Sequence, residues 1–181
     1  MRLCFFLLTY FFRLFLLRAK PQDVTGTPVT AVLTLIAVIV ANVSIFSSLL
    51  GAVEALQRSI LEQVILALAL LIGLSMSGHR ERFLQLYTAL CGAGLVISLV
   101  SWPIYQGLES LESIAELGVS GQVAMLSLHV WSIIVMGHIL RHGFDTRLSV
   151  GIMMSMVYVV SVITIAAMIF PAPQVSPVDA L

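Results

Sequence analysis

Long uncharged runs alternate with short charged segments along the chain. Charged residues are missing from five windows, at 24–53, 63–79, 83–108, 117–140 and 148–178. Each window holds the roughly 20 apolar residues that a helix needs to cross the hydrocarbon core of a bilayer. Backbone groups have no water to bond in lipid, so we expect helices in these windows; a transmembrane barrel would show short alternating strands.

The windows predict an all-α membrane protein with five transmembrane helices, preceded by an N-terminal interfacial amphipathic helix. The expected spans lie near residues 29–50, 60–78, 83–105, 119–140 and 148–170. In the second span, we expect Glu62 and Gln63 to lie at the membrane interface. We divide the chain into the interfacial helix at 1–20, a five-helix transmembrane domain at 21–170 and an outer C-terminal tail at 171–181.

The basic residues indicate an orientation. If the N-terminus is cytoplasmic, every Lys and Arg except Arg58 falls on the inner side, as the positive-inside rule requires. We therefore expect a bacterial inner (cytoplasmic) membrane protein with its N-terminus in the cytoplasm and its C-terminus outside. The expected partner on the inner face is anionic lipid headgroups, with contacts from Arg2, Arg13, Lys20, Arg80 and Arg82.

The first twenty residues do not resemble a signal peptide, because Arg13 follows the apolar run without a small-residue cleavage site. Helical spacing places Arg2, Thr9, Arg13 and Lys20 on one narrow stripe. This pattern is typical of a helix lying in the inner interface, with cations on headgroups and aromatic rings at the acyl boundary. A cytoplasmic helix docked on the bundle is the alternative. Pro21 and the Thr-Gly-Thr-Pro run at 25–28 are expected to end this helix.

Composition excludes other classes of protein. Apolar residues make up 60% of the 181 residues and charged residues only 10%, whereas soluble domains carry about 25% charged residues. The mean hydropathy is +1.08. The formal net charge is zero, so no basic excess favours nucleic acid as a partner. Another membrane protein or a second copy of the chain stays open as a partner.

Small and polar residues within the spans are the expected helix contacts. The positions singled out for packing or interhelical hydrogen bonding are Asn42, Gly73, Ser77, Gly92, Gly94 and the bundle-facing His129. The pairs Ala89 with Ala93 and Gly151 with Ser155 have the same small-residue spacing. A polar path for a solute is the alternative. We favour packing, because we place no charged pathway residue of the kind that marks pumps inside the spans.

Three histidines are the candidates for metal or haem binding. His79, His138 and His142 are expected at one membrane depth, and the last two share a helix face. Such a cluster could ligate a metal or a haem. The chain has no Cys-x-x-Cys or Cys-x-x-Cys-His motif, so we expect neither a metal nor a cofactor and assign headgroup or backbone contacts instead.

The remaining polar features indicate no catalysis. Glu109, Glu112 and Glu116 are expected on the solvated face of an outer amphipathic connector. Cys4 and Cys91 predict no disulfide, and no phosphate loop, serine elbow or carboxylate pair is present. We therefore expect no enzymatic activity.

Two stretches resemble the YIP family of Ypt/Rab-interacting membrane proteins in a compact bacterial form. They are GHRERFLQLYTALCGAGLVISLVSWPIY at 78–105 and VWSIIVMGHILRHGFDTRLSVGIMMSMVYVV at 130–160. The resemblance implies five spans and a trafficking or membrane-organising role. The Asp-Leu-Tyr-Gly-Pro element of eukaryotic members is absent, so GTPase binding is not carried over.

The sequence thus predicts an organising or accessory membrane protein that binds lipid or a membrane-protein partner without catalysis. A small solute or lipid transporter or channel is the alternative. A haem- or metal-binding redox subunit is the third hypothesis.

Overall fold

The computed structural model describes residues 2–24, 26–108 and 118–171, without the side chains of residues 2–6 and 108. The acidic connector expected at 109–117 and the tail beyond residue 171 lie outside the described residues. The side chains of Arg2 and Cys4 also lie outside them.

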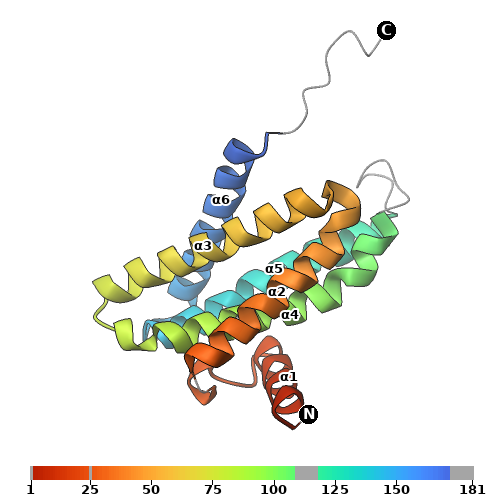
Figure 1. The fold of residues 1–181 in the computed structure, drawn as a ribbon. Helices are drawn as coiled ribbons and strands as arrows, with labels where there is room; N and C mark the ends of the chain where they lie inside the picture. The colour runs from red at the N-terminus through yellow and green to blue at the C-terminus, as the bar shows by residue number, and fades with distance from the viewer. Residues whose placement is uncertain (1, 25, 109–117, 172–181) are drawn as a thin grey trace, which may run out of the picture.

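The described chain is helical and contains five helices long and apolar enough to cross a membrane (Figure 1). They are α2 (Pro28–Leu50), α3 (Ala52–Met76), α4 (Phe83–Leu108), α5 (Val119–Gly143) and α6 (Leu148–Ile169). A shorter helix, α1 (Arg2–Phe15), precedes them, and the 3₁₀ turns η1 (Pro21–Asp23) and η2 (Arg80–Arg82) precede α2 and α4. The expected all-α membrane protein with five spans is confirmed.

Local chemistry explains where several helices begin and end. Thr27 caps α2 by accepting a hydrogen bond from the backbone N–H of Thr30 (3.2 Å), and Pro28 fits the first helical position. Gly51 alone separates α2 from α3, and its positive φ of 81° turns the chain back. Asp145 is also left-handed (φ 51°) after α5, so Thr146 N–H can reach the Arg141 carbonyl at 2.9 Å.

These turns define the two ends of the bundle. We call the end with the α2–α3 turn the Gly51 end, and the end with the α3–α4 and α5–α6 turns the Asp145 end. The second span begins at Ala52, earlier than the sequence reading near residue 60. The Arg58 guanidinium pairs with the Glu54 carboxylate at 2.7 Å, one turn apart on α3, so charged residues fit inside the helix.

Helix α4 lies at the centre of the bundle and packs against α2, α5 and α1. Small residues make this possible, because Ala89, Gly92 and Ala93 are buried and leave room for neighbouring side chains. Many large apolar side chains on the other helices point outward, as expected of surfaces that face lipid tails. Helix α6 leans away from α2 and α4 in Figure 1 and buries little of its surface.

Helix α1 docks on the bundle beside α4 (Figure 1). Phe11 is 2% exposed, and its ring occupies the space that a Cβ on Gly92 would need. Trp131 of α5 donates its indole N–H to the Phe15 carbonyl at 3.2 Å. Helix α1 therefore contacts the bundle, as in the alternative, while Arg13 and a stripe of Leu8, Phe12 and Leu16 stay exposed. Its position in the membrane interface stays a prediction.

The helical stripe expected for the N-terminal cations is wrong at Lys20. Helix α1 ends at Phe15 because Leu17 is left-handed (φ 59°) and Arg18 N–H bonds the Arg13 carbonyl at 2.8 Å. Lys20 therefore lies beyond the helix, where its carbonyl accepts a hydrogen bond from the Tyr10 hydroxyl at 2.7 Å.

Candidate functional site

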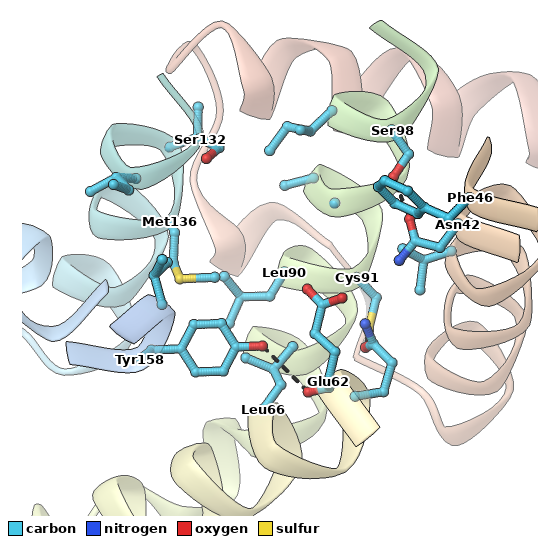
Figure 2. Close-up of a pocket in the computed structure, with 18 residues that line it drawn as sticks. Asn42, Phe46, Glu62, Leu66, Leu90, Cys91, Ser98, Ser132, Met136 and Tyr158 are labelled. Atoms are coloured by element: carbon cyan, nitrogen blue, oxygen red, sulfur yellow. Dashed lines mark hydrogen bonds between the residues drawn. The ribbon is translucent and has the colours of Figure 1, made fainter. Parts of the chain in front are cut away.

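A cavity of about 250 Å³, with several polar residues in a mainly apolar lining, lies inside the bundle between walls from α2 to α6 (Figure 2). Glu62 of α3 lines this cavity. The residue lies about 15 Å along the helix axis from Ala52, at 1.5 Å per residue. A carboxyl that lines a cavity between spanning helices is a candidate functional site, because ionisable residues inside such bundles are rare and costly.

The Glu62 carboxylate points into the cavity from the α3 wall in Figure 2. The backbone carbonyl of Glu62, and not its carboxylate, accepts a hydrogen bond from the Tyr158 hydroxyl of α6 at 3.3 Å. Among the described residues, no side chain or backbone group donates to the carboxylate itself, and no cation pairs with it. The carboxylate is therefore available to a bound molecule.

Interhelical hydrogen bonds organise the remaining polar wall. Ser98 of α4 donates its hydroxyl to the Asn42 side-chain oxygen of α2 at 2.7 Å. Cys91 of α4 donates its thiol to the side-chain oxygen of Gln63, which is 7% exposed, at 3.4 Å. These contacts hold α2, α3 and α4 around the cavity, so the packing role expected for Asn42 and the lining of a cavity occur at the same residue.

A second hollow, a groove of about 520 Å³, shares Asn42, Phe46 and Glu62 with the cavity. From Glu62 it extends toward the Gly51 end between α2, α3 and α6. Its walls are mainly apolar, formed by Phe46, Leu50, Ala55, Val162, Ile163, Ala166, Ala167 and Phe170. The cavity has more polar residues in its lining than the groove, and Glu62 lines both.

Two further polar residues line this groove. The Ser59 hydroxyl oxygen is buried and has no hydrogen-bond partner within the described ranges. Arg58 is occupied, because its guanidinium pairs with Glu54 at 2.7 Å and lies 5.0 Å from the centre of the Phe170 ring. An unpartnered buried hydroxyl is uncommon in proteins and needs an explanation such as a bound polar group.

The sequence reading missed this site, because it placed Glu62 and Gln63 at the interface and no charged residue inside the bundle. The structure places Glu62 on the cavity wall and buries Gln63, whereas their depth in a membrane stays a prediction. Glu54, Arg58 and Glu62 are spaced four residues apart, which places them on one helix face and is compatible with a longer α3. This spacing could have indicated the longer helix, but the search for charge-free windows did not consider the charged residues between them.

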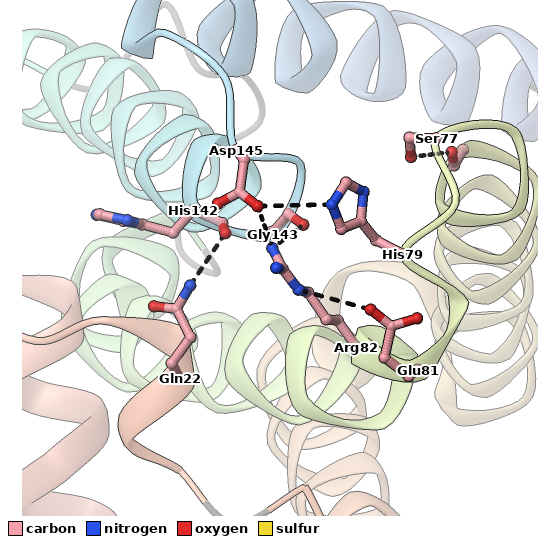
Figure 3. Close-up of polar contacts among 9 residues, drawn as sticks. Gln22, Ser77, His79, Glu81, Arg82, His142, Gly143 and Asp145 are labelled. Carbon is pink, nitrogen blue, oxygen red and sulfur yellow. Dashed lines mark hydrogen bonds and ion pairs between the residues drawn. The ribbon is translucent and has the colours of Figure 1, made fainter.

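A polar network closes the Asp145 end of the bundle (Figure 3). The Asp145 carboxylate pairs with the Arg82 guanidinium at 2.7 Å and with His79 Nε2 at 3.5 Å. Arg82 also donates to the Gly143 carbonyl at 3.2 Å. Arg82 is therefore held by the protein instead of being free for headgroups as expected, whereas Arg80 is exposed.

The three candidate histidines do not form one cluster. The His138 and His142 rings pack edge to face with centres 4.8 Å apart, and His138 Nε2 donates to the Ala19 carbonyl at 3.2 Å. His79 instead faces Asp145 (Figure 3). Within the described part of the chain, no three His, Cys, Asp or Glu side chains are placed to hold a metal ion.

Of the other residues expected to pack helices together, two glycines do so, and Ser77 and His129 do not. Gly73 lies against the Phe144 ring, and Gly94 lies next to Val38 of α2. Ser77 is exposed and donates its hydroxyl to the Gly73 carbonyl of its own helix at 2.7 Å, so it joins no helices. The bundle-facing position expected for His129 is wrong: the side chain is exposed, with Nδ1 2.8 Å from the Met125 carbonyl of its own helix.

No family model matches the chain, and no curated protein or solved structure is similar to it.

Proposed function

We propose that this multi-pass membrane protein binds a lipid-like amphiphile between its helices and does not catalyse a reaction on it. The observation that carries this proposal is the continuous lining of cavity and groove through Asn42, Phe46 and Glu62. The polar residues of the cavity suit a head, and the apolar walls of the groove suit a tail. The groove volume of about 520 Å³ lies within the range of about 300–1,000 Å³ that is usual for small-molecule sites.

The hydrogen bonds of the cavity favour binding over catalysis. Covalent catalysis needs a nucleophile within hydrogen-bond reach of a base. Cys91 instead donates to the neutral amide of Gln63. The Tyr158 hydroxyl donates to a backbone carbonyl. These groups hold helices together, which suits an organising or accessory role in the membrane.

Transport is the second candidate function, and the Glu62 carboxyl is the observation that favours it. Ionisable residues inside membrane bundles mark many substrate and proton pathways. A transporter would move a labelled amphiphile or solute across proteoliposomes, and Glu62→Gln would slow that movement. A protein that only binds would retain the ligand without flux.

We also propose the location and orientation expected from the basic residues: a bacterial inner membrane, with the Asp145 end cytoplasmic. Arg80, Arg82, Arg141 and Arg147 support this, since all four lie at or near that end. An export-dependent reporter should be active after Gly107 or Leu181 and inactive after Arg82 or Arg147. The reverse pattern at any two sites would overturn the orientation. The resemblance to the YIP family and its membrane-organising role stays a prediction.

The binding proposal is tested by photo-crosslinking in lipid nanodiscs. A photoactivatable single-chain amphiphile should label residues of the groove, and Ala166→Trp, which fills the groove, should abolish that labelling. Ala124→Trp is the matched control, because Ala124 is exposed on α5 away from the groove residues. Equal labelling of groove residues in wild type and Ala166→Trp would overturn the proposal.

A further inference from the structure

The charge inside the cavity indicates what kind of head the bound amphiphile carries. We infer that the ligand is an amphiphilic organic cation, with an ammonium group paired with the Glu62 carboxylate and an apolar chain in the groove. This inference rests on the proposed function and specifies its ligand.

The first argument is charge balance. Glu62 is the one residue with a formal charge among the described residues that line the cavity. A buried carboxylate without a counter-ion carries a high cost, whereas a well-placed cation offsets much of that cost. Arg58, one turn away on the same helix, is already paired with Glu54 at 2.7 Å. A ligand can therefore supply the positive charge that the cavity lining lacks.

The second argument is the set of groups around the carboxylate. Phe46 and Tyr158 contribute aromatic rings to the cavity wall (Figure 2), and aromatic faces attract organic ammonium groups. Two aromatic rings thus line the same cavity as the single negative charge.

The third argument concerns the chain of the amphiphile. From Glu62 toward the Gly51 end, the groove continues along Val162, Ala166 and Phe170 of α6. These side chains present apolar surface to an alkyl tail. The alternative ligand is a neutral amphiphile, such as an alcohol, bound while the Glu62 carboxyl is protonated.

The test compares three photoactivatable probes with the same dodecyl chain in phosphatidylcholine nanodiscs. One probe carries a primary ammonium head, one an alcohol and one a sulfate. In the full-length wild-type protein, the ammonium probe should label groove residues about tenfold more strongly than the alcohol, and the sulfate least. Glu62→Gln should remove this preference, and Glu62→Asp should keep most of it. The control Glu81→Gln, whose carboxylate is exposed at the Asp145 end and lines neither the cavity nor the groove, should keep all of it. Thermal unfolding in the same nanodiscs establishes that each variant is folded.

Two outcomes separate failure of this inference from failure of the proposed function. Equal labelling of groove residues by the ammonium and alcohol probes, still blocked by Ala166→Trp, would overturn the cation inference and leave the amphiphile site intact. Labelling that Ala166→Trp does not reduce for any probe would overturn both. Retention of the ammonium preference in Glu62→Gln would also overturn the inference.

Discussion

Gly151 of α6 lies so close to Gly137 of α5 that a Cβ on Gly151 would overlap the Gly137 carbonyl oxygen. Helices approach this closely where both carry glycine, and the contact is then made by backbone atoms. Ser155, one turn further along α6, donates its hydroxyl to the Ile133 carbonyl at 3.0 Å. The crossing of α5 and α6 therefore depends on small residues.

The first prediction concerns this crossing. Gly151→Ala should lower the free energy of unfolding by ~1–3 kcal/mol, because a backbone carbonyl cannot move aside as a side chain can. Thermal unfolding in detergent measures the effect. Gly107→Ala is the control, since a Cβ there meets nothing within 4 Å. Equal stability of the two variants would contradict the close approach of α5 and α6.

The second prediction concerns the docking of α1. Phe11 is 2% exposed and Phe12 is 50% exposed, so the two adjacent residues form a matched pair. Phe11→Ala should weaken docking by ~3–5 kcal/mol, the range for a buried Phe. Phe12→Ala should change docking much less.

The fluorescence of Trp131 reports this docking, because its indole bonds the Phe15 carbonyl and its ring lies 6.1 Å from the Phe15 ring. The measurement uses a Trp102→Phe background, which leaves Trp131 as the single tryptophan. An emission shift of the same size for both alanine variants would show that α1 is not held by Phe11.

The third prediction is a pH dependence at Tyr10. Burial raises the pKa of the Tyr10 phenol, and the nearby Asp23 carboxylate raises it further. The docked α1 therefore keeps Tyr10 neutral, whereas the undocked phenol ionises near its ordinary pKa of about 10. The stability from Tyr10 is fully present below about pH 10 and is lost as the pH rises above that value.

Tyr10→Phe separates this effect from other titrations. At about pH 8, the variant should lose ~1 kcal/mol of docking stability, because the hydrogen bond to the Lys20 carbonyl is removed. At about pH 11, the difference from wild type should shrink, since ionisation now opposes docking of the wild-type phenol. A difference that stays constant across this range would contradict the prediction.

The fourth prediction concerns the network at the Asp145 end. Asp145→Asn keeps a residue type that tolerates the positive φ of 51° and removes the charge that pairs with Arg82 and His79. The side chain is more than half exposed, so the expected loss of stability is only ~0.5–1 kcal/mol, and it should decrease at high salt. Glu81→Gln, which alters a longer contact of 3.8 Å with Arg82, should have a smaller effect. A larger effect of Glu81→Gln would contradict this assignment.

The fifth prediction keeps the headgroup hypothesis testable for the cations that the structure leaves exposed. Arg13→Gln and Arg80→Gln should each weaken binding of anionic lipid about fivefold, since a basic residue near such a surface contributes ~1 kcal/mol. Native mass spectrometry of nanodiscs with phosphatidylglycerol counts the bound lipids. Arg58→Gln is the control, because Arg58 lies in the part of α3 near the Gly51 end of the bundle, away from Arg80. An equal loss in all three variants would contradict a specific inner surface.

The sequence was informative where single-residue hydrophobicity decides the structure. Windows without charge predicted the five spans closely, and Gly92 and Gly94 were expected to pack against other helices, as they do. The depth of Glu62 could not be read from such windows, because a charge that faces a cavity and a charge at an interface look alike. Likewise, an apolar stripe does not show whether it faces lipid or protein, so the sequence gave no indication that Tyr10, Phe11 and Leu14 of α1 are buried. The orientation of His129 depends on how far α5 is covered by its neighbours, which is a tertiary property.

The docking of α1 also constrains the order of assembly. The contacts of α1 are with Gly92 of α4 and Trp131 of α5, which are synthesised much later than α1. The N-terminal helix therefore lacks these partners until α4 and α5 have been synthesised and inserted. Its final position is acquired after α5 enters the bilayer, so the first helix of the chain is among the last to reach its place.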